Sequence, residues 1–491
     1  MKADKTISWF SVLILAFCVV VLLFSVRGNG IWIDEGQTFI VINASFSKMI
    51  NTIFKTGNAI GGMPLYFICE FCWCKIFGYS EYALRSMNLI FAIPILWGSI
   101  KLIGVMNKPF WMIILISLNP VLLYYMNEAR PYVVIYACGV WCFYFLFRHL
   151  EDINSEDVFG FSVCFGVGCA FHMMFIFMGI IYIYLEYRRF RQGKLQIWEQ
   201  LVIWLRVLPF FLLLAIHYFH FVFGALEVNS NTAHPLASIL QIGYYFAGLG
   251  GLGWSRNDLR SMNLAITPRI VVSLTIIIVS YILLIMYFLR CRLYKEKTIG
   301  IQLISIISAL FCFIIVNIIL KTRFWERHVI FLLPGISLNL AFVLHELFAR
   351  VNTRTVKAAL GTFLLMYLLS GLNLIVMEYY QKDNYRGAVE LARSFQPTHI
   401  FFQGDPFTYE YYGLYGENAE KALESDDMIK ANVNITNADE EMLDFLLDKT
   451  HGDTILILSE KSDLDEGNLY KKFSQYGSFV NSFSIVFIPF W

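Results

Sequence analysis

Long apolar stretches recur along most of the chain, separated by short polar turns. Each is close to the roughly 20 residues that an α-helix needs to cross a bilayer. The pattern predicts about eleven membrane-spanning helices, at residues 7–26, 84–105, 109–127, 131–148, 157–170, 172–187, 200–222, 268–290, 298–320, 329–348 and 358–377. An odd number of spans places the two ends of the chain on opposite sides of the membrane.

Beyond residue 377 the pattern changes, because helical and strand periods alternate there. Three helical periods and three strand-like runs follow one another, at residues 385–395, 398–404, 438–452, 453–460, 466–477 and 478–490. That order predicts a small α/β domain. We therefore expect a mostly α-helical protein, with a polytopic transmembrane bundle at residues 1–377 and an α/β domain at residues 378–491.

The composition supports a membrane protein. Hydrophobic residues make up 58% of the 491 residues and charged residues only 15%, against about 25% charged in a typical soluble domain. The net charge of +1 hides an asymmetry, because residues 378–491 carry 20 acidic and 9 basic side chains, a charge of −11, and the remainder carries +12. The basic residues lie in short loops, where membrane topology accounts for them. Nothing indicates binding to nucleic acid.

The loops that the span count places on the N-terminal side are consistently basic. They contain Lys101, Lys108, Arg148, Arg188, Arg189, Arg191, Lys194, Arg290, Arg292, Lys295, Lys297, Arg350, Arg354 and Lys357. Cytoplasmic loops carry an excess of Lys and Arg. This predicts a multi-pass protein of the cell (inner) membrane with a cytoplasmic N-terminus and an extracytoplasmic C-terminal domain. Basic residues that break the trend include Arg27, Lys48, Lys55, Lys75, Arg85, Arg130, Arg256, Arg260, Arg269, Lys321, Arg323 and Arg327.

One apolar segment, residues 63–78, allows two interpretations. As a full span it would invert every later loop and turn the arginine-rich loops outward. We therefore interpret it as an amphipathic helix on the outer membrane surface, which would leave Glu70 and Lys75 in water. The first outer loop, residues 27–83, is then long and ordered, with helices at the membrane interface.

Several polar motifs fall on the outer side of the predicted bundle. They supply Asp34 and Glu35 in "WIDEGQTF", Glu128, Arg130 and Tyr132 in "NEARPY", His172 in a short turn, and Arg323, Arg327 and His328 in "KTRFWERH". Each alone fits a solvated loop, a lipid headgroup contact or a packed turn residue. Arginine should be scarce on this side, however, so the combination indicates a bound anion.

The chemistry of these residue types suggests a reaction. Arginine offers several fixed donors and binds phosphate well. A carboxylate beside the anion could accept the proton of an acceptor hydroxyl or amine, while the arginines stabilise the departing phosphate. Transfer of a sugar from a lipid phosphate would need these parts.

The same motifs, taken in order, resemble those of the GT-C glycosyltransferases of the protein-O-mannosyltransferase and lipid A aminoarabinose transferase type. The bacterial branch related to the rhizobial core-oligosaccharide transferases is the most similar. The motifs are "WIDEGQTF", "GGMPLYF", "GYSEYALRSMNLIF", "NEARPY", "AFHMMF", "RHVIFLLP" and "DNYRGAVELA". The sequence departs from the family pattern at Gly62, Met63 and His328.

The resemblance implies a polyprenyl-phosphate-linked sugar donor and transfer outside the cytoplasm. It implies Asp34 as the catalytic base supported by Glu35, and Arg85, Arg130 and Arg327 as ligands of the donor phosphate. The acceptor stays open between a glycolipid, a polysaccharide and a protein. Membrane lipid surrounds the bundle.

No cofactor and no metal site are predicted. Some GT-C enzymes use a divalent metal, which stays possible here, but no second DxD-like motif is found in the outer turns. The cysteine cluster of Cys69, Cys72 and Cys74 lies among apolar residues and lacks a partner set at zinc-like spacing. We interpret these thiols as packing residues.

Two other functions compete with sugar transfer from a lipid monophosphate. A polysaccharide polymerase or ligase would use a diphosphate-linked oligosaccharide, and its large outer loop would more often come late in the chain. A transporter or flippase would place ionisable residues near the middle of the membrane, whereas the predicted spans are almost free of charge. A sensor with an acidic outer domain would leave the outer arginines unexplained.

Overall fold

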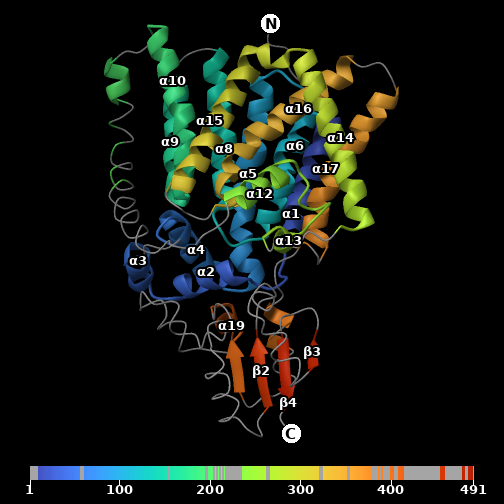
Figure 1. Ribbon diagram of the computed structural model, residues 1–491. Coiled ribbons are helices and arrows are strands. Elements are labelled where there is room, and N and C mark those ends of the chain that lie inside the picture. The colour runs from blue at the N-terminus through green and yellow to red at the C-terminus, as the bar shows by residue number, and fades with distance from the viewer. Residues whose placement is uncertain are drawn as a thin grey trace. The chain divides into compact units, whose positions relative to one another are not determined.

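In the computed structural model of the chain, helices form nearly all of the described part before residue 377, and the described strands lie beyond it (Figure 1). The structure describes residues 9–55, 60–151, 155–193, 197–202, the single positions 205, 208, 212 and 215, and residues 235–260, 266–319, 324–350, 354–377, 380, 385–387, 389–390, 399–402, 407–413, 454–458, 478–480 and 485–489.

The chain divides into two compact units. The helical unit comprises Met1–Arg27, Gly57–Cys69 and Arg85–Tyr380. The mixed unit combines two pieces of the predicted first outer loop with the C-terminal region and comprises Gly28–Thr56, Glu70–Leu84 and Gln381–Trp491.

Helices of very different length build the helical unit. They are α1 (Trp9–Ser25), α5 (Glu81–Val105), η1 (Phe110–Met112), α6 (Ile113–Ser117), α7 (Pro120–Met126), α8 (Tyr132–Glu151), α9 (Ser155–Phe171), η2 (Met173–Met178), α10 (Gly179–Arg191), α12 (Pro235–Phe246), α13 (Arg256–Arg260), α14 (Pro268–Arg290), η3 (Leu293–Lys295), α15 (Lys297–Ile319), η4 (Glu326–Leu332), α16 (Leu333–Arg350) and α17 (Arg354–Val376).

Five of the described helical stretches are long and apolar enough to cross a membrane. They are Glu81–Val105, Tyr132–Leu150, Ile270–Arg290, Ile299–Ile319 and Glu326–Arg350. Two shorter apolar helices, Trp9–Ser25 and Leu360–Val376, coincide with two more predicted spans. The prediction of a polytopic helical bundle is confirmed, and the protein is a multi-pass membrane protein. The predicted span at 200–222 lies mostly outside the described residues.

Helix α8 lies at the centre of the bundle and α14 at its edge. In the α8 span 78% of the residues are buried inside the protein, against 22% in α14. The exposed apolar side chains of α14 are the surface expected to face lipid. A methyl group at Gly139 of α8 would overlap the carbonyl oxygen of Phe331 in η4. Only glycine allows these two backbones to approach so closely.

The segment 109–127 corrects one prediction. The sequence predicts a single span there, but the chain forms η1, α6 and α7, which are 3, 5 and 7 residues long. The reason is the pair Asn119–Pro120. Proline has no N–H to continue a helix, and the Asn119 side chain accepts hydrogen bonds from Val121 N–H (2.9 Å) and Leu122 N–H (3.4 Å), which caps α7.

In the mixed unit one helix packs against a short helix of the C-terminal region. Helix α2 (Ile33–Asn43) precedes α3 (Phe46–Lys55) and contacts α19 (Phe407–Tyr411). Ile40 and Phe407 form a small buried cluster in this contact.

Four strands of the C-terminal region form one sheet in the order β1-β2-β4-β3. Strand β1 (His399–Phe402) is parallel to β2 (Thr454–Leu458), while β4 (Ile485–Pro489) is antiparallel to both β2 and β3 (Ser478–Val480). The described strands thus form the sheet that the predicted α/β domain requires.

The last strand of that region corrects a second prediction. The sequence suggests one strand over 478–490, but the structure has two antiparallel strands with Val480 paired to Ile485. The predicted helices at 438–452 and 466–477 lie outside the described residues.

The ambiguous segment 63–78 forms helix α4 (Pro64–Phe77), which is 14 residues long. A helix of this length is too short to cross a bilayer. Lys75 is exposed, as predicted. The prediction that Glu70 would lie in water is wrong. Its side chain is buried, and its Oε1 accepts a hydrogen bond from the Cys74 thiol at 3.6 Å.

Candidate active site

The acidic pair of the first outer loop lies in the first turn of α2, and its two members have different surroundings. Glu35 is fully buried, and its Oε2 accepts a hydrogen bond from the Trp32 N–H at 3.3 Å. This contact caps the start of the helix. Asp34 is half-buried and keeps part of its side chain exposed. Of the two carboxylates, Asp34 is therefore the one that a substrate could reach.

The "NEARPY" turn is tied to neighbouring segments of the helical unit by buried hydrogen bonds. The Asn88 amide of α5 donates to the Glu128 carbonyl at 2.7 Å. The Arg27 N–H donates to the side chain of Asn127 at 2.8 Å. Arg85 is also buried, and its Nη1 donates to the Arg27 carbonyl at 2.7 Å. Arg85 therefore has a structural contact with Arg27 in addition to its predicted role as a phosphate ligand.

Four of the predicted site residues come together in the helical unit. The ring centroids of Tyr132 and His172 are 5.9 Å apart, and those of His172 and His328 are 5.8 Å apart. The Arg327 guanidinium lies over the Tyr132 ring at 5.7 Å from its centroid. Burial lowers the pKa of His172 to about 3, with the positive charges of Arg327 and Arg130 as further causes. His172 is therefore neutral near pH 7, and the positive charge resides on the arginines.

The two histidines are oriented by the same kind of backbone contact. Nδ1 of His172 accepts from the Met174 N–H, and Nδ1 of His328 accepts from the Trp325 N–H, both at 3.2 Å. In a neutral imidazole that accepts at Nδ1, the proton is on Nε2. Each neutral ring would then offer one N–H donor on its opposite edge.

A neighbouring buried carboxylate, Glu326, was not anticipated from the sequence. Its two oxygens accept from the Tyr125 hydroxyl (2.6 Å) and the Gln241 amide (2.7 Å), and Arg256 lies 3.8 Å away. The Tyr125 ring also packs on Tyr132 at 4.8 Å, which joins this group to the histidine pair. The sequence contains one indication of this group, Arg256, which is among the basic residues on the predicted outer side, where few are expected.

Several charged groups lie near Tyr125 and the two histidines. The buried or half-buried ones among the described residues are Glu128, Arg130, Arg256, Glu326 and Arg327. Guanidinium groups bind phosphate through several fixed donors, so the three arginines of this cluster could bind an anionic ligand.

The remaining candidates fall elsewhere. Arg323 lies outside the described residues. Asp34 and Glu35 belong to the mixed unit, whereas the other described candidates belong to the helical unit. Within the described part of the chain, no group of three or more His, Cys, Asp or Glu side chains is arranged to hold a metal ion.

Comparison with solved structures identifies the fold. ArnT from Cupriavidus metallidurans in the apo state is similar with a TM-score of 0.56, and the same protein bound to undecaprenyl phosphate with a TM-score of 0.51. Both share 11% sequence identity with this chain, and each match covers 98% of this chain and 97% of ArnT. No protein-family model and no curated protein matches the sequence. The resemblance to the GT-C transferases is thus confirmed as a likeness of fold over nearly the full length.

Proposed function

We propose that the protein is a membrane glycosyltransferase that moves a sugar from a polyprenyl-phosphate-linked donor to an acceptor outside the cytoplasm. The observation that carries the proposal is the cluster of Arg130 and Arg327 with the histidine pair, in a chain with the fold of ArnT. One solved ArnT structure holds undecaprenyl phosphate. A lipid phosphate is the kind of anion that such a cluster would accept at the membrane surface.

The donor phosphate would be held by the guanidinium groups of Arg130 and Arg327, which give short charge-assisted hydrogen bonds. The Nε2–H groups of His172 and His328 would add neutral donors. Stacking of Arg327 on Tyr132 fixes the direction of one guanidinium. Donors fixed in advance stabilise the negative charge that develops on the departing phosphate without having to reorganise.

In the proposed reaction one bond to the anomeric carbon forms and one breaks. The oxygen or nitrogen of the acceptor forms a bond to the anomeric carbon of the sugar, and the bond from that carbon to the phosphate oxygen breaks. The acceptor proton passes to Asp34 as the general base. The polyprenyl phosphate leaves as the second product, and Glu35 supports the helix turn that carries Asp34.

The other predicted ligands keep narrower roles. Arg85 is held on the Arg27 carbonyl, and the backbone of Glu128 is held by the Asn88 amide, so both would support the segments beside the phosphate. Arg323 stays a candidate for the phosphate site. No metal or other cofactor enters the proposed reaction.

The experiment that tests the function compares envelope glycans with and without the gene by mass spectrometry. We expect one sugar residue to be missing from a glycolipid, polysaccharide or protein in the deletion strain. The purified protein, given that acceptor and a polyprenyl-phosphate sugar, should release the lipid monophosphate. Release of a lipid diphosphate would instead indicate a polymerase or ligase, and unchanged glycans in the deletion strain would contradict sugar transfer.

The proposed reaction also requires a definite topology, with the N-terminus in the cytoplasm and residues 378–491 outside it. A reporter that is active only outside the cytoplasm, fused at Trp491, should therefore be active. A second fusion within the basic loop after α10, at Gly193, should be inactive with the same reporter. The reverse pattern would contradict this topology.

A further inference from the structure

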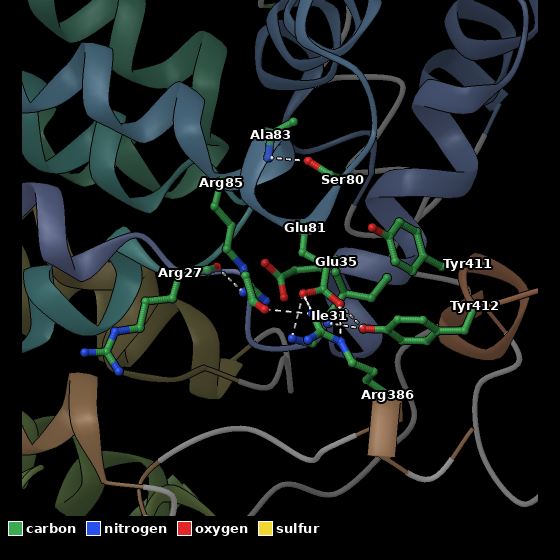
Figure 2. Close-up of polar contacts among 12 residues, drawn as sticks. Arg27, Ile31, Glu35, Ser80, Glu81, Ala83, Arg85, Arg386, Tyr411 and Tyr412 are labelled. Atoms are coloured by element: carbon green, nitrogen blue, oxygen red, sulfur yellow. Dashed lines mark hydrogen bonds and ion pairs between the residues drawn. The ribbon is translucent and has the colours of Figure 1, made fainter. Parts of the chain in front are cut away.

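A buried carboxylate that has no role in the reaction above, Glu81 at the start of α5, collects three partners in the mixed unit (Figure 2). Its Oε2 accepts the Gly30 N–H at 2.9 Å, and its Oε1 accepts the Tyr412 hydroxyl at 2.6 Å and the Nε of Arg386 at 2.9 Å. Arg386 also forms an ion pair through Nη2 with Oε2. Burial raises the pKa of Tyr412 to about 12, so its hydroxyl stays protonated and can donate at neutral pH.

These partners also hold the backbone of the segment that leads into α2. The Nη2 of Arg386 donates to the Gly28 carbonyl at 2.7 Å, and the Tyr412 hydroxyl accepts the Ile31 N–H at 2.8 Å. Gly30 has a φ of 80°, a conformation that favours glycine, and marks the turn between these contacts. Within four residues, one carbonyl and two N–H groups are therefore fixed by side chains from distant parts of the chain.

The same helix is held along its side by the C-terminal region. A Cβ atom at Gly36 would lie 2.8 Å from both the backbone nitrogen and the Oγ1 of Thr408. Such distances require a glycine, because any side chain would push α19 away from α2. The first turn of α2, with Asp34, is therefore bounded by α19 on one side and by the contacts of Glu81 at its start.

We propose that Glu81, Arg386 and Tyr412 are positioning residues that fix Asp34 for proton transfer. The C-terminal domain would then contribute to the reaction by ordering the acidic segment of the first outer loop. This inference rests on the proposed role of Asp34 as the general base. Displacing a reacting group by about 1 Å can lower a rate by about 100-fold, so loss of these contacts should reduce turnover.

If these residues only stabilised the fold, their replacement would lower turnover only together with folding. The Arg386 side chain is 39% exposed, and ion pairs that reach solvent contribute little to the stability of a fold. Replacing Arg386 should therefore leave the protein folded while releasing the segment before α2. Loss of turnover without loss of folding distinguishes positioning from stabilisation.

The test uses the full-length protein in lipid nanodiscs, with the variants Arg386→Gln and Tyr412→Phe. Hydrogen exchange at the amides of Gly30 and Ile31 should accelerate in both variants. Tyr412→Phe removes the acceptor of the Ile31 N–H, and Arg386→Gln releases the Gly28 carbonyl and the Glu81 carboxylate that hold the same segment. We expect kcat to fall by about tenfold or more, with the KM for the polyprenyl-phosphate sugar unchanged. Glu81→Gln, alone and combined with Arg386→Gln, completes a double-mutant cycle. The two effects should be less than additive, because Glu81 and Arg386 share an ion pair.

Two matched controls remove similar groups elsewhere. Tyr411→Phe removes a hydroxyl that donates to the Tyr79 carbonyl at 2.9 Å, one residue from Tyr412, and Arg350→Gln removes an arginine paired with Glu346. Neither should change kcat. Faster exchange without a fall in kcat, or an equal fall in the controls, would overturn the positioning role. Absence of transfer by the unmodified protein would overturn the proposed function instead, and unchanged exchange in Arg386→Gln would overturn the contacts themselves.

Discussion

Replacing Asp34 by asparagine is expected to lower the rate of sugar transfer by a factor of about 10² to 10⁴, the range that a general base contributes. The amide has nearly the same size as the carboxylate but cannot take the proton of the acceptor. Because Asp34 is half-buried at the helix start while Glu35 is buried and bonded to the Trp32 N–H, the change should leave the helix intact. Initial rates with the purified protein, together with its elution from a sizing column, measure both effects.

A matched control for this variant is Glu156→Gln. Glu156 is an exposed carboxylate in the first turn of α9, so its replacement removes a helix-start charge of the same kind. Its effect on the transfer rate should be negligible. If folded Asp34→Asn protein transfers sugar as fast as the Glu156→Gln control, the base lies elsewhere.

Apolar run length predicts the helices of the bundle well, because each must hide its backbone polar groups from lipid. It fails at 109–127, where the apolar residues are continuous but the helix is interrupted. Asn119 explains the failure. Its amide donates to Ser337 (3.0 Å) and Tyr367 (2.8 Å), side chains more than 200 positions away, which makes a polar helix break acceptable inside the protein.

The turn residues of the site could be predicted because they break a simple rule. Arg130 and Arg327 are basic on the side where topology predicts few basic residues. In the structure the positive charges of both contribute to the lowered pKa of His172. The sequence also marks His328, which lies beside Arg327 in the chain. What the sequence does not contain is the arrangement of these groups in space, in which the Tyr132 ring lies 5.7 Å from the Arg327 guanidinium and 5.9 Å from the His172 ring.

The contacts of Glu81 and Glu326 could not be predicted for a different reason. Glu81 pairs with Arg386, which is 305 positions away, and Glu326 accepts from Tyr125 at a separation of 201. A single sequence shows neither pairing, because any of many arginines or tyrosines could serve each carboxylate equally well. The bounds of the two compact units could not be predicted for the same reason. The compact unit that holds the C-terminal region also takes in residues 28–56 and 70–84, which only tertiary contacts reveal.

Replacing Arg130 by alanine is expected to weaken binding of the polyprenyl-phosphate donor by about 10- to 150-fold, because a hydrogen bond to a charged group contributes about 1.5–3 kcal/mol. Arg130 is 2% exposed, so water could not fully replace its guanidinium as a donor to the phosphate. The acceptor should bind as before, because its binding does not depend on the phosphate. Titration of the purified protein with a polyprenyl phosphate, and separately with the acceptor, measures the two affinities.

The matched control is Arg290→Ala, which removes an exposed arginine from the last turn of α14. It changes the net charge equally, so any general electrostatic effect on an anionic lipid should appear in both variants. A weakening confined to Arg130→Ala supports a direct contact with the phosphate. Equal donor affinity in the two variants would remove Arg130 from the phosphate site. The Arg130 guanidinium would then serve another anion or the packing of the "NEARPY" turn.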